Sequence, residues 1–279
     1  MSVSSAMIKE LRERTGVGVS KCKEALEKSA GNMDEAISFL RKAGMATAVK
    51  KSGREAKEGK IAFKETDNCV AIVEVSSETD FVASNDRFVE FLNNMVEEVA
   101  QTQPASLEDF MKQKFSKDSS MTIEECQGTL VQAIGENIQV KRFVTFAKKP
   151  GKTLGVYSHM GGKIITLVEM EGDSVDVAKD VAMHAAAASP DFLSPEKVPQ
   201  NVIDHERDIA RGQLAGKPEH IMDKILEGKI NAFYDDVCLL RQKFVKDDSM
   251  TVGAFVDQKG KEAGKTFVVT DFIRWSIGE

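Results

Sequence analysis

The chain has 279 residues, of which 42% are hydrophobic and 29% are charged, and its net charge is −6. This length allows two or three domains, and the composition is that of an ordinary folded protein. The negative net charge argues against a protein that binds nucleic acid along its whole length, because such proteins are basic.

The sequence shows no sign of membrane insertion or secretion. No apolar run approaches the roughly 20 residues of a membrane helix, and charged side chains interrupt residues 1–20, so we expect no signal peptide. The 4 cysteines are dispersed and form no Cys-x-x-Cys pair. Dispersed cysteines suit a reducing cytoplasm and give no zinc pattern. We therefore expect a cytoplasmic protein with no metal and no cofactor.

Residues 4–44 are predicted to form three short helices. The first ends near Gly16, where glycine allows a tight turn, and the second covers about residues 20–29. Asn32 is placed to cap the third, with Glu35 as the partner in a capping box. A bundle of this size resembles the ubiquitin-associated fold. It is expected to bind a protein through its first loop, or else to be a passive cap.

A basic stretch with little apolar content follows the bundle, over about residues 46–60. Its basic residues, with two that precede it, are Arg41, Lys42, Lys50, Lys51, Arg54, Lys57 and Lys60. This composition predicts a solvated linker, with contact to an acidic partner surface as a further possibility. An RNA-binding arm is a weaker alternative, because no aromatic residues alternate with the basic ones to stack on bases.

The remainder of the chain contains an internal repeat. Gln113–Thr122 recurs as Gln242–Thr251, with eight of ten positions identical. The same spacing also pairs three further sets of residues: Gly135 with Gly264, Val140 with Val269, and Phe143 with Phe272. Chance does not produce agreement of this kind, so the sequence predicts a duplicated unit.

Each copy is predicted to have two strands, a helix, a second helix and a last strand. In the first copy these are residues 60–65, 69–76, 86–101, a helix from Thr122, and 138–147. In the second copy they are residues 154–159, 163–170, 175–188, a helix from Thr251, and 266–275. Short strands segregated from helices predict an α+β fold with mainly antiparallel sheets.

This organisation predicts three domains. Residues 1–52 form the helical domain with the basic linker, 53–149 the first α+β subdomain, and 150–279 the second.

The second copy carries an insertion at about residues 199–240. Apolar residues recur in it at spacings of three and four, which predicts an antiparallel helical hairpin. Gly216 would turn the chain and Pro218 would begin the second helix. Such a hairpin must bury its second face, either on the body or on another chain.

A motif between the second strand and the following helix presents an acid and an aromatic ring. The apolar strand ends at Ser77, and the pair Thr79-Asp80 predicts a helix N-cap directly before Phe81 and Val82. Side chains in a first turn project outward, where a partner could receive them. The alternative is that Phe81 folds back onto the core.

Enzyme signatures are missing from the sequence. Gly151–Thr153 has the tail of a phosphate loop, but Phe146 stands where the leading glycine must be. The 4 histidines are not spaced as a metal set. His184 lies in a run of alanines, which by itself predicts a surface or half-buried histidine.

Several motifs together resemble bacterial elongation factor Ts. They follow the family's order over almost the whole chain: Lys9–Gly18, Val73–Val82, Ile134–Ile138, Met183–Ala186 and Gly216–Glu219. The resemblance implies guanine-nucleotide exchange on elongation factor Tu, in which the factor binds the GDP form, displaces magnesium and releases GDP. It implies neither enzyme activity nor nucleotide binding by the chain itself.

The resemblance also implies which residues contact Tu. The magnesium-displacing motif of the family corresponds to Thr79, Asp80, Phe81 and Val82. A second contact would use His184 with Ile134, Gly135 and Glu136, and the bundle would contribute Lys9, Leu11, Arg12 and Val19. Many family members carry two methionines where this chain has Val19 and Ser20, so that part of the surface departs from the pattern.

One alternative function and one further partner remain open. A translation-associated RNA or ribosome binder would use the basic stretch, and its RNA binding would depend strongly on salt. The net charge of −6 speaks against it. The helical hairpin could also dimerise the complex with Tu.

Overall fold

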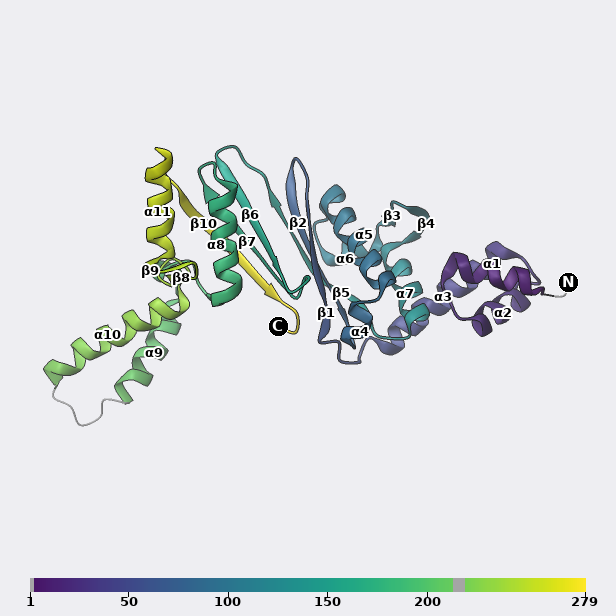
Figure 1. Ribbon diagram of the computed structural model, residues 1–279. Helices are drawn as coiled ribbons and strands as arrows, with labels where there is room; N and C mark the ends of the chain where they lie inside the picture. The colour runs from purple at the N-terminus through teal and green to yellow at the C-terminus, as the bar shows by residue number, and fades with distance from the viewer. Residues whose placement is uncertain (1–2, 213–218) are drawn as a thin grey trace. The chain divides into compact units, whose positions relative to one another are not determined.

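The computed structural model describes residues 3–212 and 219–279 (Figure 1). Helices and antiparallel sheets make up the described part, which confirms the predicted α+β class. The chain divides into two compact units. The first comprises the described residues of Met1–Ala147, Gly161–Lys163 and Ser276–Glu279, and the second comprises those of Lys148–Met160 and Ile164–Trp275. Within the described ranges, no helix combines the length and apolar character needed to cross a membrane.

The first unit contains both the helical bundle and the first copy of the repeat. Its elements are α1 (Ser5–Thr15), α2 (Val19–Lys28), α3 (Met33–Lys51), β1 (Glu58–Glu65), β2 (Cys69–Ser77), α4 (Asp80–Ala83), α5 (Asp86–Thr102), α6 (Leu107–Lys112), β3 (Lys114–Phe115), β4 (Asp118–Thr122), α7 (Ile123–Ile134) and β5 (Gln139–Ala147). The sheet has the antiparallel order β1-β2-β5. Alternate β2 side chains, from Ala71, Val73 and Val75, share one core with α5.

The second unit contains the second copy and the insertion. Its elements are β6 (Lys152–His159), β7 (Ile164–Glu171), α8 (Val175–Ala188), a 3-10 turn η1 (Pro195–Lys197), α9 (Gln200–Gly212), α10 (Glu219–Val237), β8 (Lys243–Phe244), β9 (Asp247–Thr251), α11 (Val252–Ala263) and β10 (Val268–Ser276). The sheet order is β10-β7-β6. Its core joins Val168 and Met170 of β7 to Val181 of α8 and Phe255 of α11.

The three N-terminal helices form as predicted, except that Glu35 does not complete the predicted capping box, because the Asn32 N–H donates to the Ser29 carbonyl oxygen at 2.8 Å. Gly16 ends α1 in the left-handed region (φ 68°), and the Asn32 side chain accepts hydrogen bonds from the backbone N–H groups of Asp34 and Glu35 at the start of α3. The bundle has its own small core, made of Leu11, Val17, Cys22, Ala25, Leu26, Ala36 and Leu40.

The third helix is longer than predicted, and the linker prediction is wrong over residues 46–51. These residues form the last turns of α3. Alanine favours helix at positions 46 and 48, and Gly44 lets α3 approach the backbone of Gly128 in α7. A Cβ on Gly44 would lie 2.8 Å from the Gly128 carbonyl oxygen. Residues 52–57 alone connect α3 to β1.

The structure confirms the internal repeat. β3 pairs with β4 and β8 pairs with β9 in matching registers, with Lys114 opposite Thr122 and Lys243 opposite Thr251. The helices α7 and α11 begin where the repeat predicts, and Thr122 and Thr251 cap them. These two small hairpins and α6 were not predicted, because a two-residue strand carries no readable alternation.

The insertion forms the predicted pair of helices, α9 and α10. They contact each other through a small cluster that includes Ala210 and Leu226. Gly216 and Pro218, which are predicted to turn the hairpin and start its second helix, lie outside the described residues.

Candidate functional site

The motif that follows β2 forms a separate short helix, α4. Thr79 caps it in an extended conformation, and its Oγ1 accepts a hydrogen bond of 3.3 Å from the N–H of Val82. The Ser77 hydroxyl donates to the Thr79 carbonyl oxygen at 2.9 Å and so closes the strand end. Asn85 then caps α5. The predicted N-cap at Thr79 is therefore confirmed.

The four residues of α4 divide between the core and the solvent. Ala83 is buried and Val82 packs against the core of the first unit. Asp80 and Phe81 point outward, and Phe81 is 85% exposed, the largest value among the large hydrophobic side chains that the structure describes as exposed. The alternative in which Phe81 folds back onto the core is therefore wrong. Because α4 is a single turn and Val82 and Ala83 occupy the side that faces the core, Asp80 and Phe81 must face the solvent.

A carboxylate from the α7–β5 turn holds the N-cap. Glu136 Oε2 accepts from the Thr79 N–H at 3.0 Å, and Glu136 Oε1 accepts from the Thr79 hydroxyl at 2.7 Å. In the opposite direction, Glu78 Oε1 accepts from the Asn137 N–H at 2.7 Å. Glu136 therefore bonds within the first unit, whereas His184, with which it was predicted to form a second contact, lies in the second unit, and that shared contact stays a prediction.

The bundle presents only part of its predicted surface. Lys9 and Arg12 are exposed, and Val19 is 51% exposed at the start of α2. Leu11 is fully buried in the bundle core, so its prediction as a contact residue is wrong. The loop after α1 is tied to the start of α5, because Arg87 Nη1 donates to the Gly16 carbonyl oxygen at 2.8 Å.

His184 is not a surface residue. It is 1% exposed on α8, so its prediction as surface or half-buried is wrong. Gln242 uses its Nε2 to donate to two backbone carbonyls, which leaves its Oε1 facing His184 Nε2 at 3.0 Å. The Val245 N–H donates to His184 Nδ1 at 3.1 Å. The proton of the neutral ring therefore lies on Nε2, and burial lowers the pKa of His184.

The alanines around His184 serve packing within the second unit. A Cβ on Gly155 of β6 would lie 2.3 Å from the backbone of Ala178, so α8 approaches this strand closely. Ala182 and Ala185 are fully buried, whereas Ala187 and Ala188 are exposed. Small side chains on α8 are therefore required by the helix–sheet contact, and only the end of the run faces solvent.

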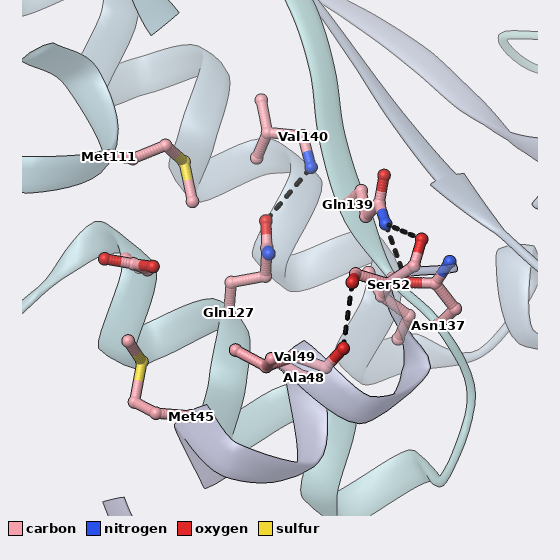
Figure 2. A pocket seen from close by; sticks show the side chains of 11 residues that line it. Met45, Ala48, Val49, Ser52, Met111, Gln127, Asn137, Gln139 and Val140 are labelled. Carbon is pink, nitrogen blue, oxygen red and sulfur yellow. Dashed lines mark hydrogen bonds between the residues drawn. The ribbon is translucent and has the colours of Figure 1, made fainter. Parts of the chain in front are cut away.

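A groove of about 270 Å³ lies beside the α7–β5 turn, between α3 and β5 (Figure 2). Met45, Val49 and Met111 supply apolar walls. Two of its polar side chains bond within the protein: Gln127 accepts from the Val140 N–H at 3.0 Å, and Gln139 donates to the Ser52 carbonyl at 3.1 Å (Figure 2). The first bond joins α7 to β5 and the second joins the end of α3 to β5, so both helices are fixed to the strand that follows the turn carrying Glu136.

The phosphate-loop remnant is the beginning of a strand. Lys152 bonds to Glu169 across the β6–β7 pair, which raises the pKa of Lys152, and Thr153 Oγ1 donates to the Gly172 carbonyl at 2.7 Å. Among the described residues, no group of three or more histidines, cysteines or acids could hold a metal ion. Cys126 lies on α7 and is partly buried, and burial raises the pKa of its thiol to about 12.

Three residues of the site were not predicted: Glu78, Asn137 and Arg87. Each acts on a segment far from it in sequence, so periodicity could not identify it. The repeat did hold a signal for Glu136. Because Gly264 of the second copy corresponds to Gly135, the residue that corresponds to Glu136 is Lys265. The two copies therefore carry opposite charges at this turn.

Comparison with known proteins gives consistent results. The family model "Elongation factor TS" matches residues 78–279. A protein of Protochlamydia amoebophila named Elongation factor Ts is 58% identical over 280 residues, covering 100% of this chain and 99% of the relative. Proteins of the same name from Trichlorobacter lovleyi and Chlamydia muridarum are 43% and 41% identical, covering 100% and 99% of this chain and 94% and 98% of the relatives.

Proposed function

The chain belongs to the elongation factor Ts family and is a translation elongation factor, and we propose that it is the guanine-nucleotide exchange factor of elongation factor Tu. In this proposal it binds Tu in the GDP form in the cytoplasm, displaces the magnesium of Tu and promotes release of GDP. It transfers no chemical group of its own and does not itself bind the nucleotide.

The exposure of Phe81 carries this proposal. Burial of a phenylalanine side chain is worth about 1.5–3 kcal/mol, and Phe81 gains almost none of it in the free chain because it is 85% exposed. An apolar pocket on Tu would recover that free energy on binding. The ring would then act as a wedge that shifts the magnesium-holding element of Tu, with Asp80 beside it.

Exchange of this kind is a negative coupling between two ligands of Tu. If the wedge weakens GDP binding by some factor, GDP must weaken binding of the exchange factor by the same factor. GTP would expel the factor by the same reciprocity. Because the coupling is an equilibrium property, the proposal requires no catalytic acid, base or nucleophile in this chain.

Further contacts with Tu follow from the surfaces that the structure leaves open. Lys9, Arg12 and Val19 are accessible on the bundle, and Gly135 is accessible beside Glu136. His184 and Leu11 are inside the protein, and Ile134 is half-buried, so their roles would be structural. Dimerisation of the complex through α9 and α10 remains part of the proposal, and Ile209 at 44% exposure offers an apolar side chain for it.

Two of the basic residues on which the alternative RNA or ribosome binder would rely already have acceptors within the protein. Lys51 lies in α3 and donates to the Gly135 carbonyl, and Arg54 pairs with Glu78 at 3.5 Å. These side chains are engaged with acceptors of the protein itself. RNA binding by the chain with a steep salt dependence would revive this alternative.

The decisive experiment follows release of fluorescent GDP from loaded Tu in excess unlabelled nucleotide. Substoichiometric amounts of the chain should accelerate release with turnover, since the factor leaves when new nucleotide binds. Removal of magnesium by a chelator serves as the positive control for the competence of Tu. A release rate that does not change with the concentration of the chain would refute the proposal.

A further inference from the structure

We propose that Glu136 is a positioning residue that holds α4 in place and so orients Phe81 toward the partner. This inference rests on the proposed function, but it assigns Glu136 a task different from direct contact with Tu. Its action is already present in the free protein, where it can be measured without Tu.

The geometry of the Glu136 carboxylate fixes the conformation of the N-cap residue. One oxygen accepts from the Thr79 N–H at 3.0 Å and the other from its hydroxyl at 2.7 Å. The hydroxyl has a single proton, which it gives to Glu136, so its lone pair is directed to the Val82 N–H at 3.3 Å. Hydrogen bonds to an ionised acceptor are about twice as strong as neutral ones. One side chain therefore sets both the backbone and the rotamer at Thr79.

A helix as short as α4 needs such an anchor. It has four residues, and an isolated helix of that length is not stable in water. Packing secures its far end, where Ala83 is buried, but Phe81 contributes no packing. The near end depends on Thr79. Holding the ring in its bound orientation before Tu arrives would reduce the entropy lost on binding.

The turn that carries Glu136 is itself immobilised. Lys51 donates to the carbonyl of Gly135, and the Asn137 N–H donates to Glu78 Oε1 at 2.7 Å. Asn137 also donates through Nδ2 to the Arg54 carbonyl at 2.7 Å. Glu136 and Glu78 thus bond in opposite directions between the two segments, and the anchor is rigid relative to the sheet.

The second copy of the repeat provides an internal comparison. Gly264 corresponds to Gly135, so Lys265 stands where the first copy has Glu136. Lys265 Nζ lies 3.8 Å from Asp173 and does not hold a cap. There, Ser174 caps α8 directly, and no short helix separates β7 from the long helix. The carboxylate at this turn is therefore present in the copy that contains α4 and absent from the copy that lacks such a short helix.

Amide hydrogen exchange in the free protein tests the anchor directly. Glu136→Ala should raise the exchange rates of the Thr79 and Val82 amides on the order of ten- to hundredfold, because a hydrogen bond to a charged acceptor is lost. Glu136→Gln keeps one acceptor oxygen and should retain part of the protection. The matched control is Glu125→Ala, which removes a similar capping bond of 2.8 Å to the Thr122 N–H at α7. It should leave both amides unchanged.

A double-mutant cycle with Phe81→Ala separates positioning from contact. If Glu136 acts through Phe81, Glu136→Ala should slow GDP release from Tu in the wild-type background and have little further effect in the Phe81→Ala background. Additive effects would show that Glu136 touches Tu independently and would overturn the inference, as would unchanged exchange of the Thr79 and Val82 amides. If the wild-type chain does not release GDP at all, the proposed function fails, while the amide measurement still decides whether Glu136 anchors α4.

Discussion

The Val245 N–H donates a hydrogen bond of 3.1 Å to Nδ1 of His184, which ties the β8–β9 hairpin to α8. The first copy makes the same link with different chemistry, because the Ser116 N–H donates to Glu98 Oε1 at 2.9 Å. Val245 and Ser116 occupy equivalent positions in the repeat, and Glu98 and His184 are both buried in the long helix that follows the first two strands of each copy, α5 and α8. A carboxylate and an imidazole therefore serve as alternative acceptors for one hairpin.

The imidazole makes the stability of the second unit sensitive to pH. Protonation of Nδ1 would convert the acceptor of the Val245 N–H into a donor. Burial lowers the pKa of His184 in the folded protein, whereas an unfolded histidine titrates near about 6.5. The unfolded state therefore binds more protons at mildly acidic pH, and stability should fall as the pH drops from about 7 to about 5.

Replacement of the histidine tests this pH dependence. His184→Gln keeps an acceptor and a donor without a titrating ring, so urea unfolding should show a flatter dependence between about pH 7 and about pH 5. The Asp180–Lys246 pair (2.6 Å), which joins the same helix and hairpin, remains intact in this variant. The control His205→Gln removes an exposed histidine of α9. An equal slope for His184→Gln and the wild type would contradict the prediction.

The contact between α3 and α7 depends on two glycines. Gly44→Ala would place a Cβ 2.8 Å from the Gly128 carbonyl oxygen. Alanine ordinarily favours helix over glycine by about 1 kcal/mol, but overpacking costs about 1–3 kcal/mol, so we expect a net loss of stability. The control Gly228→Ala lies in α10 with nothing within 4 Å, and it should be neutral or stabilising. Chemical denaturation of the two variants measures the difference, and a stabilised Gly44→Ala protein would show that this contact yields easily.

Sequence patterns predicted the elements that depend on neighbouring residues. The strands and long helices of both copies, the helix starts near Thr122 and Thr251, and the cap at Thr79 follow from local alternation and capping chemistry. The exposure of Phe81 was one of two alternatives that spacing could not separate. The structure decides it because Val82 and Ala83 occupy the core side of the single turn.

Two of the errors concern contacts between distant segments. Residues 46–51 look like a linker by composition, but they continue α3 beyond the contact of Gly44 with Gly128 of α7, and Ala48 packs against the core of the first unit. The partners of His184, at positions 242 and 245, are invisible to any window centred on α8. In both cases the burial and contacts of the segment depend on residues distant in sequence and not on the local propensity of the segment.

Asp80 and Phe81 should have separable effects on exchange. Asp80 is exposed at the first position of α4, so Asp80→Asn should preserve the fold and much of the affinity for Tu. If Asp80 binds beside the magnesium site of Tu as proposed, loss of its charge should instead change how strongly GDP release depends on magnesium concentration. Asp86→Asn, at the exposed first position of α5, is the matched control. Titration of magnesium in the release assay checks this, and an unaltered magnesium dependence in Asp80→Asn would contradict it.

Phe81→Ala should lower exchange activity while hardly changing the stability of the free protein. The ring is 85% exposed, so folding gains little from it, whereas truncation of a buried phenylalanine such as Phe88 should cost about 3–5 kcal/mol. Loss of about 1.5–3 kcal/mol of burial in the complex corresponds to a decrease in exchange efficiency on the order of ten- to hundredfold. Urea unfolding and GDP release are measured on the same preparation, with Phe63→Ala on β1 as the control for loss of a partly exposed ring. If Phe81→Ala lost activity only in proportion to a loss of stability, or kept full activity, the ring would not be the wedge.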